Sequence, residues 1–373
     1  MKKILFLAAV SAIAMTSCVN EESDLANPQK QVLKFDAPVL SQTRANVNGE
    51  ISGIKYPETE HFKVYCKAYK GGFKGWNASD NVSDYFDANG EVAKSGLAVG
   101  AGKYWATDIV HYWPEVDYNL AFAAYSPAEF SSAPSAVVSH TEKGLQIKNF
   151  VTAANSDEQF DLMYTLRKYD LNKVAYANAA VPLAFQHALS SIVFSSQKSS
   201  SDVNYKITKI EVKGLFCEQA DFNQNVTESY TAGVYSETEA PVWENKVAAS
   251  GVVTYTPGFT EFSVPVEAPA QFTSGESALL LIPQDVPAEA TVTVYYTKIT
   301  NPGLPSEKTL ETSATIKLKD FCYNNDGTNH YVNTWERGKR YVYRIAFGQN
   351  TRIYFEPSIT DWVQEPTLVY TIQ

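Results

Sequence analysis

The stretch QVLKFDAPVLSQTRA, residues 31–45, places apolar side chains on alternate positions. They are Leu33, Phe35, Ala37 and Val39. A period of two is typical of a β-strand that buries one face. A polar tract follows with one basic residue, Arg44. One interpretation is an ordinary first strand and its loop. The other is a removable strand, residues 32–44, which a protease cutting between Arg44 and Ala45 would detach, leaving an apolar groove that recruits another strand.

Composition favours strands over helices throughout the chain. Its 373 residues are 45% hydrophobic, with 23 Tyr and 19 Phe but 3 Met. The length suits two domains, and the aromatic content predicts an all-β class. The net charge is −10 and becomes −12 if Lys2 and Lys3 are removed with a leader. This acidity argues against nucleic acid as a partner.

The N-terminus has the features of an export signal. Residues 1–17 combine two lysines with an apolar core that is too short for a permanent membrane helix. Thr16-Ser17-Cys18 is similar to the lipobox of bacterial lipoproteins, which predicts a lipid on Cys18 and a lipidated linker over residues 18–31. Met15 departs from the usual lipobox leucine, so cleavage by the general signal peptidase stays open. The acidic residues 20–24 are either a surface-export signal or a solvated linker.

Short alternating runs separated by turn residues continue along the chain, which is the pattern of a β-sandwich or barrel. In residues 62–69, FKVYCKAY, we expect one face in the core and the other in water. Residues 71–102 are expected to form long loops with short strands. Further strands are expected at residues 181–195, 205–212, 251–255, 262–266, 278–282, 291–297, 314–318, 339–348 and 352–362. The predicted domains are 32–186 and 187–373.

The C-terminus alternates once more. Residues 366–373 put Leu368, Tyr370 and Ile372 on one face, as a second strand at a free chain end. If this strand fills the groove of another copy, the head-to-tail contact does not close and builds a filament. The alternative is that it completes its own sandwich.

Enzymatic motifs are weak. Gly96–Lys103 resembles a phosphate loop, but Leu97 and Tyr104 replace a required glycine and the magnesium-binding hydroxyl. The five histidines lack metal-site spacing, and His187 is interpreted as structural. We therefore expect no catalytic residues, no metal and no cofactor. Besides Cys18, three cysteines remain and are interpreted as small core residues with one optional disulfide: Cys66, Cys217 and Cys322.

Nearly the whole chain resembles the fimbrillins, the Mfa-like pilins of Bacteroidales. The resemblance rests on the leader, on the first strand ending in Gln42-Thr43-Arg44-Ala45, and on a series of short motifs in order. These motifs are His111–Pro114, Asp161–Tyr164, Phe185–Ser190, Leu279–Gln284, Trp335 with Gly338-Lys339, and Ile359–Trp362. The family implies two tandem transthyretin-like β-sandwich domains, delivery to the cell surface as an outer-membrane lipoprotein, and removal of the first strand at an arginine.

The family also implies that a donor strand from a neighbouring subunit is then inserted, and that this polymerises the pilin into a fimbrium. The implied partners are other pilin subunits, in a homopolymer or heteropolymer, and a host glycan or protein that the fimbrium adheres to. A stalk role fits better than an anchor role, and a tip adhesin stays open. The rival is a monomeric surface lipoprotein that binds carbohydrate by stacking sugar rings on exposed tryptophans, Trp76, Trp105 and Trp113.

Overall fold

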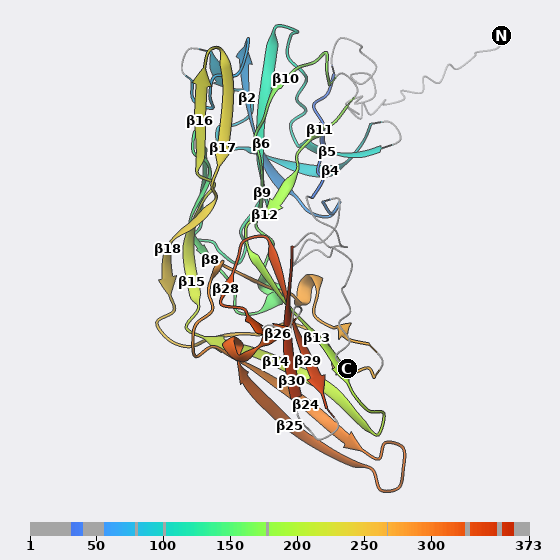
Figure 1. The fold of residues 1–373 in the computed structure, drawn as a ribbon. Helices are drawn as coiled ribbons and strands as arrows, with labels where there is room; N and C mark the ends of the chain where they lie inside the picture. Colours follow the sequence, from blue (N-terminus) through green and yellow to red (C-terminus); the bar gives the residue numbers. More distant parts are fainter. Residues whose placement is uncertain are drawn as a thin grey trace, which may run out of the picture.

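The computed structural model describes residues 31–39, 56–78, 81–99, 102–176, 179–266, 268–324, 329–348 and 353–361. Regular structure in these ranges is almost entirely β-strand, which confirms the all-β prediction. The exceptions are three 3-10 turns, η1 (Ser156–Glu158), η2 (Gly275–Ser277) and η3 (Leu318–Asp320). Figure 1 shows the strands gathered in two parts that follow one another along the molecule.

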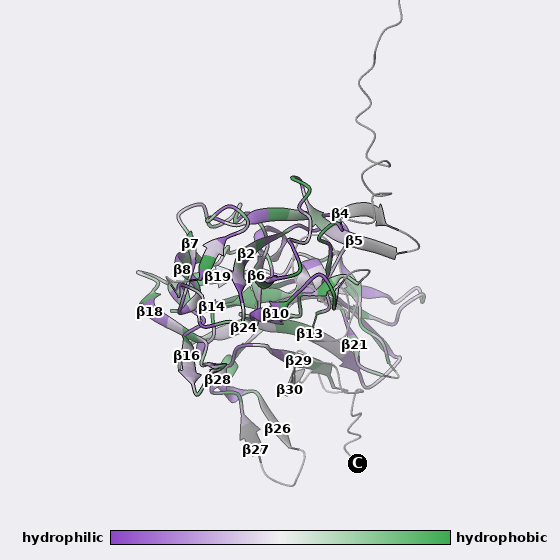
Figure 2. Ribbon diagram, turned by 90° about the horizontal axis from the view of Figure 1, so that it is seen from above, coloured by the Kyte–Doolittle hydropathy of each residue, from purple (hydrophilic) through white to green (hydrophobic). Residues whose placement is uncertain are grey.

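A sheet of ten strands, called here the large sheet, forms most of the first part. Its main order is β11-β1-β5-β4-β2-β6-β9-β12, with β3 on β2 and β10 on β6. The strands are β1 (Phe35–Asp36), β2 (Phe62–Lys70), β3 (Val82–Asp84), β4 (Glu91–Val99), β5 (Gly102–Thr107), β6 (Tyr118–Ser126), β9 (Met163–Thr165), β10 (Lys168–Leu171), β11 (Val181–Pro182) and β12 (Phe185–His187). Seen from above, β6 lies in the middle of the projection (Figure 2).

A second sheet, the covering sheet, packs on the large sheet in the order β18-β15-β8-β7. Its strands are β7 (Val137–Thr141), β8 (Gly144–Val151), β15 (Cys217–Asn223) and β18 (Val242–Ala248), and the hairpin β16 (Val226–Thr231) and β17 (Val234–Glu239) connects the last two. Strands from both sides of residue 186 therefore share one sheet. The division into domains at that position stays a prediction.

The covering sheet corrects the expectation that one face of β2 is wet. Tyr65 and Tyr69 were expected in water but are 5% and 1% exposed, because they pack with Ile147 and Phe222 of the covering sheet. The opposite face of β2, with Phe62 among its residues, packs into a separate core. Both faces of this strand are thus buried.

Two five-stranded sheets enclose the core of the second part. One contains β13 (Ser190–Lys198), β21 (Ala270–Gln271), β22 (Leu279–Leu281), β29 (Lys339–Phe347) and β30 (Ile353–Asp361). The other contains β14 (Val203–Gly214), β19 (Val253–Tyr255), β20 (Phe262–Ser263), β24 (Thr291–Thr300) and β25 (Lys308–Lys317). Two short pairs complete the list, β23 (Gln284–Asp285) with β28 (Thr334–Trp335), and β26 (Cys322–Asn324) with β27 (Asn329–Tyr331). The alternation of β29 is confirmed, since Tyr341, Tyr343, Ile345 and Phe347 all face this core.

Several element boundaries differ from the sequence prediction. The region expected as loops contains the nine-residue strand β4, which pairs with β5. β25 begins at Lys308 and not near residue 314, because its first six residues pair with β24. The sequence pattern did not predict them as a strand, since these residues are polar or exposed. The hairpin β16–β17 was not expected, since its polar side chains show no apolar alternation.

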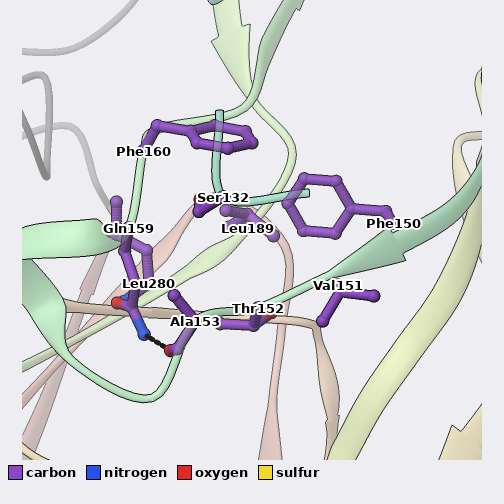
Figure 3. A pocket seen from close by; sticks show the side chains of 9 residues that line it. All are labelled: Ser132, Phe150, Val151, Thr152, Ala153, Gln159, Phe160, Leu189 and Leu280. Carbon is purple, nitrogen blue, oxygen red and sulfur yellow. Dashed lines mark hydrogen bonds between the residues drawn. The ribbon is translucent and has the colours of Figure 1, made fainter. Parts of the chain in front are cut away.

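The two parts meet at a small cavity of about 10 Å³, which Figure 3 shows between the Phe150 and Phe160 rings. Gln159 crosses this junction: its Nε2 donates to Ala153 O over 2.6 Å, and its Oε1 accepts from the Leu280 N–H over 2.6 Å. The cavity is the size of about one water molecule, so the junction is closely packed.

Candidate functional site

The first-strand segment, residues 31–39, lies between two neighbours in the large sheet. β1 pairs in parallel with β11 and antiparallel with β5. On the β11 side, the N–H groups of Val181, Leu183 and Phe185 donate to the carbonyls of Lys34, Asp36 and Pro38 over 2.8, 2.8 and 2.9 Å. On the other side, the Leu33 N–H donates to His111 O over 2.8 Å. The Trp113 N–H donates to Gln31 O over 2.7 Å, and the Tyr56 N–H donates to Ala37 O over 2.8 Å. The segment is therefore an internal strand.

Its apolar side chains fill the core on one face of the large sheet. Leu33, Phe35, Ala37 and Val39 are 2%, 0%, 0% and 4% exposed, which confirms their predicted burial. The Phe35 ring makes edge contacts with Phe62, Phe86 and Phe122 at centroid distances of 6.4, 6.4 and 5.6 Å. Removing this segment would leave an apolar groove and at least six backbone groups without their partners in the protein.

The groove has a fixed aromatic wall in Tyr56. Its ring stacks on Phe185 at 5.2 Å, and its hydroxyl donates to His61 O over 2.9 Å and lies 2.7 Å from Ser126 Oγ. Burial raises the pKa of this hydroxyl, so Tyr56 stays neutral. The Tyr56 side chain is thus held by contacts outside the first-strand segment, whereas its backbone N–H donates to Ala37 O.

The remaining predicted site residues lie outside the described part of the chain. They are the lipidation residue Cys18, the cleavage pair Arg44 and Ala45, and the donor-strand residues Leu368, Tyr370 and Ile372. Their roles stay predictions.

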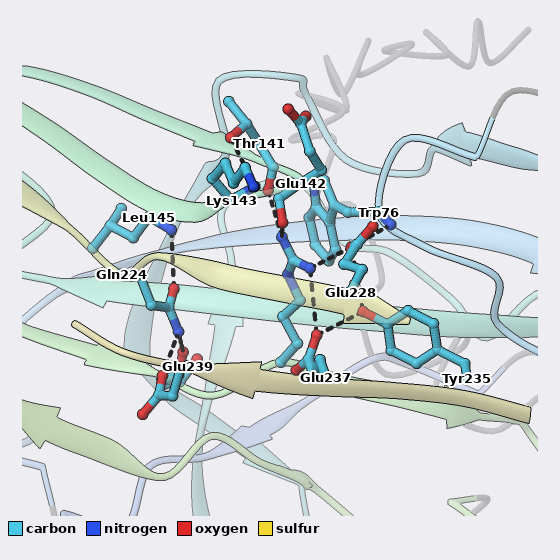
Figure 4. A network of polar contacts seen from close by, with 12 residues as sticks. Trp76, Thr141, Glu142, Lys143, Leu145, Gln224, Glu228, Tyr235, Glu237 and Glu239 are labelled. Carbon is cyan, nitrogen blue, oxygen red and sulfur yellow. Dashed lines mark hydrogen bonds and ion pairs between the residues drawn. The ribbon is translucent and has the colours of Figure 1, made fainter. Parts of the chain in front are cut away.

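A polar network centred on Arg167 fastens the hairpin β16–β17 to the first part. Figure 4 labels its partners Glu142, Glu228 and Glu237. The fully buried guanidinium lies 2.5 Å from Glu228 Oε1 and 3.4 Å from Glu237 Oε2. It also donates to Glu142 O over 3.0 Å and stacks 5.0 Å over the Trp76 ring. The hairpin has few apolar side chains to bury, so the Arg167 network provides contacts that hold it on the first part.

Further hydrogen bonds complete the network. Glu228 Oε1 accepts from the Trp76 N–H over 2.9 Å, and the Tyr235 hydroxyl donates to Glu237 Oε2 over 2.7 Å. Gly75 allows the close approach, because its φ is +138° and a Cβ there would lie 2.8 Å from Glu228 Oε2. The hairpin is therefore locked by both charge and shape.

His140 lies beneath the Arg167 network, between two aromatic rings. Its ring centroid is 4.4 Å from that of Trp76 and 5.1 Å from that of Tyr65. Burial, with Arg167 and Lys67 nearby, lowers the pKa of His140 well below its ordinary value. The imidazole is therefore neutral in the folded protein.

Arg337 joins the two parts from the turn before β29. Its Nη1 donates to the Tyr164 hydroxyl over 2.8 Å and to His187 O over 3.3 Å. His187 Nδ1 also lies 2.9 Å from Asp161 Oδ2, and both side chains are buried. The structural interpretation of His187 is in keeping with these contacts.

The tryptophans proposed for sugar stacking are buried. Trp76, Trp105 and Trp113 are 1%, 3% and 5% exposed. The carbohydrate-binding alternative in that form is wrong, because a sugar ring cannot reach rings that pack in the cores. Cys66 and Cys217 are buried free thiols, in agreement with their interpretation as core residues. Within the described ranges, no cluster of three His, Cys, Asp or Glu side chains could hold a metal.

Sequence reasoning found the first-strand segment but missed the Arg167 network. Arg167 stands alone in a short strand region, and its partners Glu228 and Glu237 follow 61 and 70 residues later. Local periodicity carries no information about such pairs. A usable signal was the alternation of Val181, Leu183 and Phe185, which marks the partner of β1.

These observations define an all-β protein of packed sheets whose first strand is sealed inside a sheet. The chain belongs to the fimbrillin-like family, whose sequence model matches residues 67–362. Fimbrillin-like proteins are fimbrial proteins of the cell surface. No helix in the described residues has the length and apolarity to cross a membrane.

A solved structure shows the same fold. A fimbrial protein from Bacteroides vulgatus is 15% identical, with a TM-score of 0.51, and the match covers 88% of this chain and 99% of that chain. Proteins from Bacteroides uniformis and Bacteroides ovatus, both provisionally described as cell adhesion proteins, are each 14% identical with TM-scores of 0.47 and cover 90% of this chain and 99% of theirs. No curated protein sequence matches.

Proposed function

We propose that the protein is a non-enzymatic subunit of a cell-surface fimbrium that polymerises by donor-strand exchange. Cleavage after Arg44 releases the first strand, and residues 366–373 of another subunit take its place. The observation that carries this proposal is the internal position of residues 31–39, whose removal opens a continuous groove with a backbone ladder on both sides.

The energies favour a stable joint. Burying each of Leu33, Phe35 and Val39 contributes about 1.5–3 kcal/mol, before the entropy of ordering the strand is subtracted. An incoming strand of similar pattern recovers the burial at the Leu33 and Phe35 sites, together with backbone hydrogen bonds to both neighbouring strands. The uncut subunit cannot polymerise, because its own strand occupies the groove.

The groove also selects the direction and register of the incoming strand. Since β1 runs parallel to β11 and antiparallel to β5, the replacement runs in the same direction as the strand it replaces. Ala37 is fully buried, so its site is too small for a tyrosine. The best register places Leu368 at the Leu33 site and Tyr370 at the Phe35 site, with Ile372 pressing into the Ala37 site.

Limited trypsin digestion of residues 19–373 tests the proposal. We expect a cut after Arg44, loss of the first strand and growth of ladders that resist SDS. The variant Arg44→Gln is the matched control and stays monomeric, and deletion of residues 368–373 abolishes the ladders without preventing the cut. A protein that is cut at Arg44, releases the strand and stays monomeric contradicts the proposal.

Export as an outer-membrane lipoprotein is the second part of the proposal. A lipid on Cys18 would hold the uncut subunit at the membrane, and cleavage after Arg44 would separate the subunit from this anchor. Labelled fatty acid should enter the protein in cells and should not enter Cys18→Ala. Labelling that persists in this variant contradicts the assignment.

A further inference from the structure

The outer face of the sheet that contains β14, β24 and β25 carries a hollow of about 530 Å³. β24 and β25 lie near the lower end of Figure 1. Register brings its lining together: Tyr295 pairs with Ser313, and Thr297 pairs with Glu311. Thr208, at the bulge of β14, closes one side. The hollow is open to solvent over much of its extent.

Tyr295 is held in place by charged neighbours. Its hydroxyl donates to Glu211 Oε2 over 2.9 Å. Glu211 accepts from Lys209 over 2.5 Å and lies 2.6 Å from Lys213 Nζ. These lysines lower the pKa of Glu211 to about 2, so the carboxylate stays charged at any physiological pH. Lys209 Nζ also lies 5.7 Å over the Tyr295 ring. The ring is therefore fixed before any ligand arrives.

The other outward-facing side chains of the lining offer hydrogen-bond donors and acceptors to solvent. Glu311 is exposed, and its carboxylate makes no hydrogen bond or ion pair with the described residues. Hydroxyls of Thr297 and Ser313 lie on the same face. No aliphatic side chain lines the hollow within the described part of the chain.

We propose that this hollow binds a neutral pyranose unit of a glycan. A sugar ring has an apolar C–H face that packs on an aromatic ring, and hydroxyls that donate to a carboxylate. Glu311 is the charged side chain in the lining, so it disfavours a sialic acid or another acidic sugar. The site is separate from the first-strand groove and does not depend on polymerisation.

Glycan binding by the uncleaved protein tests this proposal. The probes are neutral oligosaccharides released from mucin, a neutral bacterial surface polysaccharide and sialyllactose, measured on an array and then by calorimetry. Binding to either neutral probe is expected and identifies the source of the glycan. Failure of both neutral probes at millimolar concentration, or tighter binding of sialyllactose, overturns the proposal and leaves the fimbrial function untouched.

Variants assign the binding to this hollow. Tyr295→Ala and Glu311→Gln should each weaken binding by about tenfold or more, whereas Tyr295→Phe keeps the ring and most of the affinity. The control is Tyr230→Ala, which removes a tyrosine that is 47% exposed on the hairpin β16–β17. If Tyr295→Ala does not fold, the exposed Glu311→Gln decides. Unchanged affinity in Glu311→Gln overturns the proposal.

Discussion

Arg167 donates from Nη1 to Glu228 Oε1 over 2.5 Å, although the two residues are 61 positions apart in the sequence. The contact joins the segment before β10 to the hairpin β16–β17, which has little apolar surface of its own. Removing one partner of a buried ion pair leaves an uncompensated buried charge. This lowers the free energy of unfolding more than replacing both partners by apolar residues would.

We expect Glu228→Ala to lower the free energy of unfolding by about 2–3 kcal/mol, below the full value for a buried pair because the Glu228 side chain is 22% exposed. Denaturant unfolding measures this change. Lys94→Ala is the control, since its pair with Asp108 is exposed and contributes under about 1 kcal/mol. Equal effects of the two substitutions contradict the prediction.

His140 makes stability depend on acidity. Its pKa is lowered in the folded protein, so below about pH 6.5 the unfolded chain takes up a proton that the folded chain refuses. The contribution of His140 to the free energy of unfolding is fully present above that pH. Below it, this contribution falls by up to about 1.4 kcal/mol per pH unit. His140→Phe keeps a ring against Trp76 and should flatten this part of the curve. Unfolding curves of both proteins between pH 4 and 8 give the comparison, and parallel curves exclude the effect.

The register of the proposed donor strand predicts unequal roles for its residues. Tyr370→Ala should weaken the polymer joint by about 3 kcal/mol, because it empties the site of Phe35, and Tyr370→Phe should be close to neutral. Val369→Ala, on the opposite face, is the matched control. The temperature at which SDS ladders dissociate reports the change. A larger effect at Val369 would reverse the assigned faces.

The two described thiols should be unreactive in the folded protein. Burial raises the pKa of both Cys66 and Cys217, so neither supplies much thiolate. In a chain of residues 19–373 with Cys322→Ser, a thiol reagent should label neither residue until denaturant is added, and then both. Rapid labelling of the native protein would show that one of these positions opens to solvent.

Periodicity predicted those parts of the fold in which one strand buries one face. The strand at residues 62–69 was found because Phe62, Val64 and Cys66 alternate, but its second buried face was not, since Tyr65 and Lys67 read as polar neighbours. That face is covered by β8 and β15 of the covering sheet, which lie at residues 144–151 and 217–223, and their choice of partners is a tertiary property. The partners of Arg167 could not be predicted for the same reason, because Glu228 and Glu237 follow 61 and 70 residues later.

The first-strand segment could be predicted because its alternation is regular and its context is polar. Its neighbours in the sheet could not, since pairing with β11 and β5 depends on the whole order of the large sheet. The hydroxyl-rich hollow at Tyr295 was also missed. Threonines and serines on an outward strand face look the same whether or not a neighbouring strand assembles them into a site.

β1 pairs in parallel with β11, and a donor strand that keeps this pairing joins each subunit to the next head to tail. Every joint in a fimbrium built this way points the same way, so the two ends of the fibre differ chemically. One end offers an empty groove and the other an unused tail. Growth, capping and attachment can then be assigned to different ends, because one head-to-tail contact is repeated along the whole fibre.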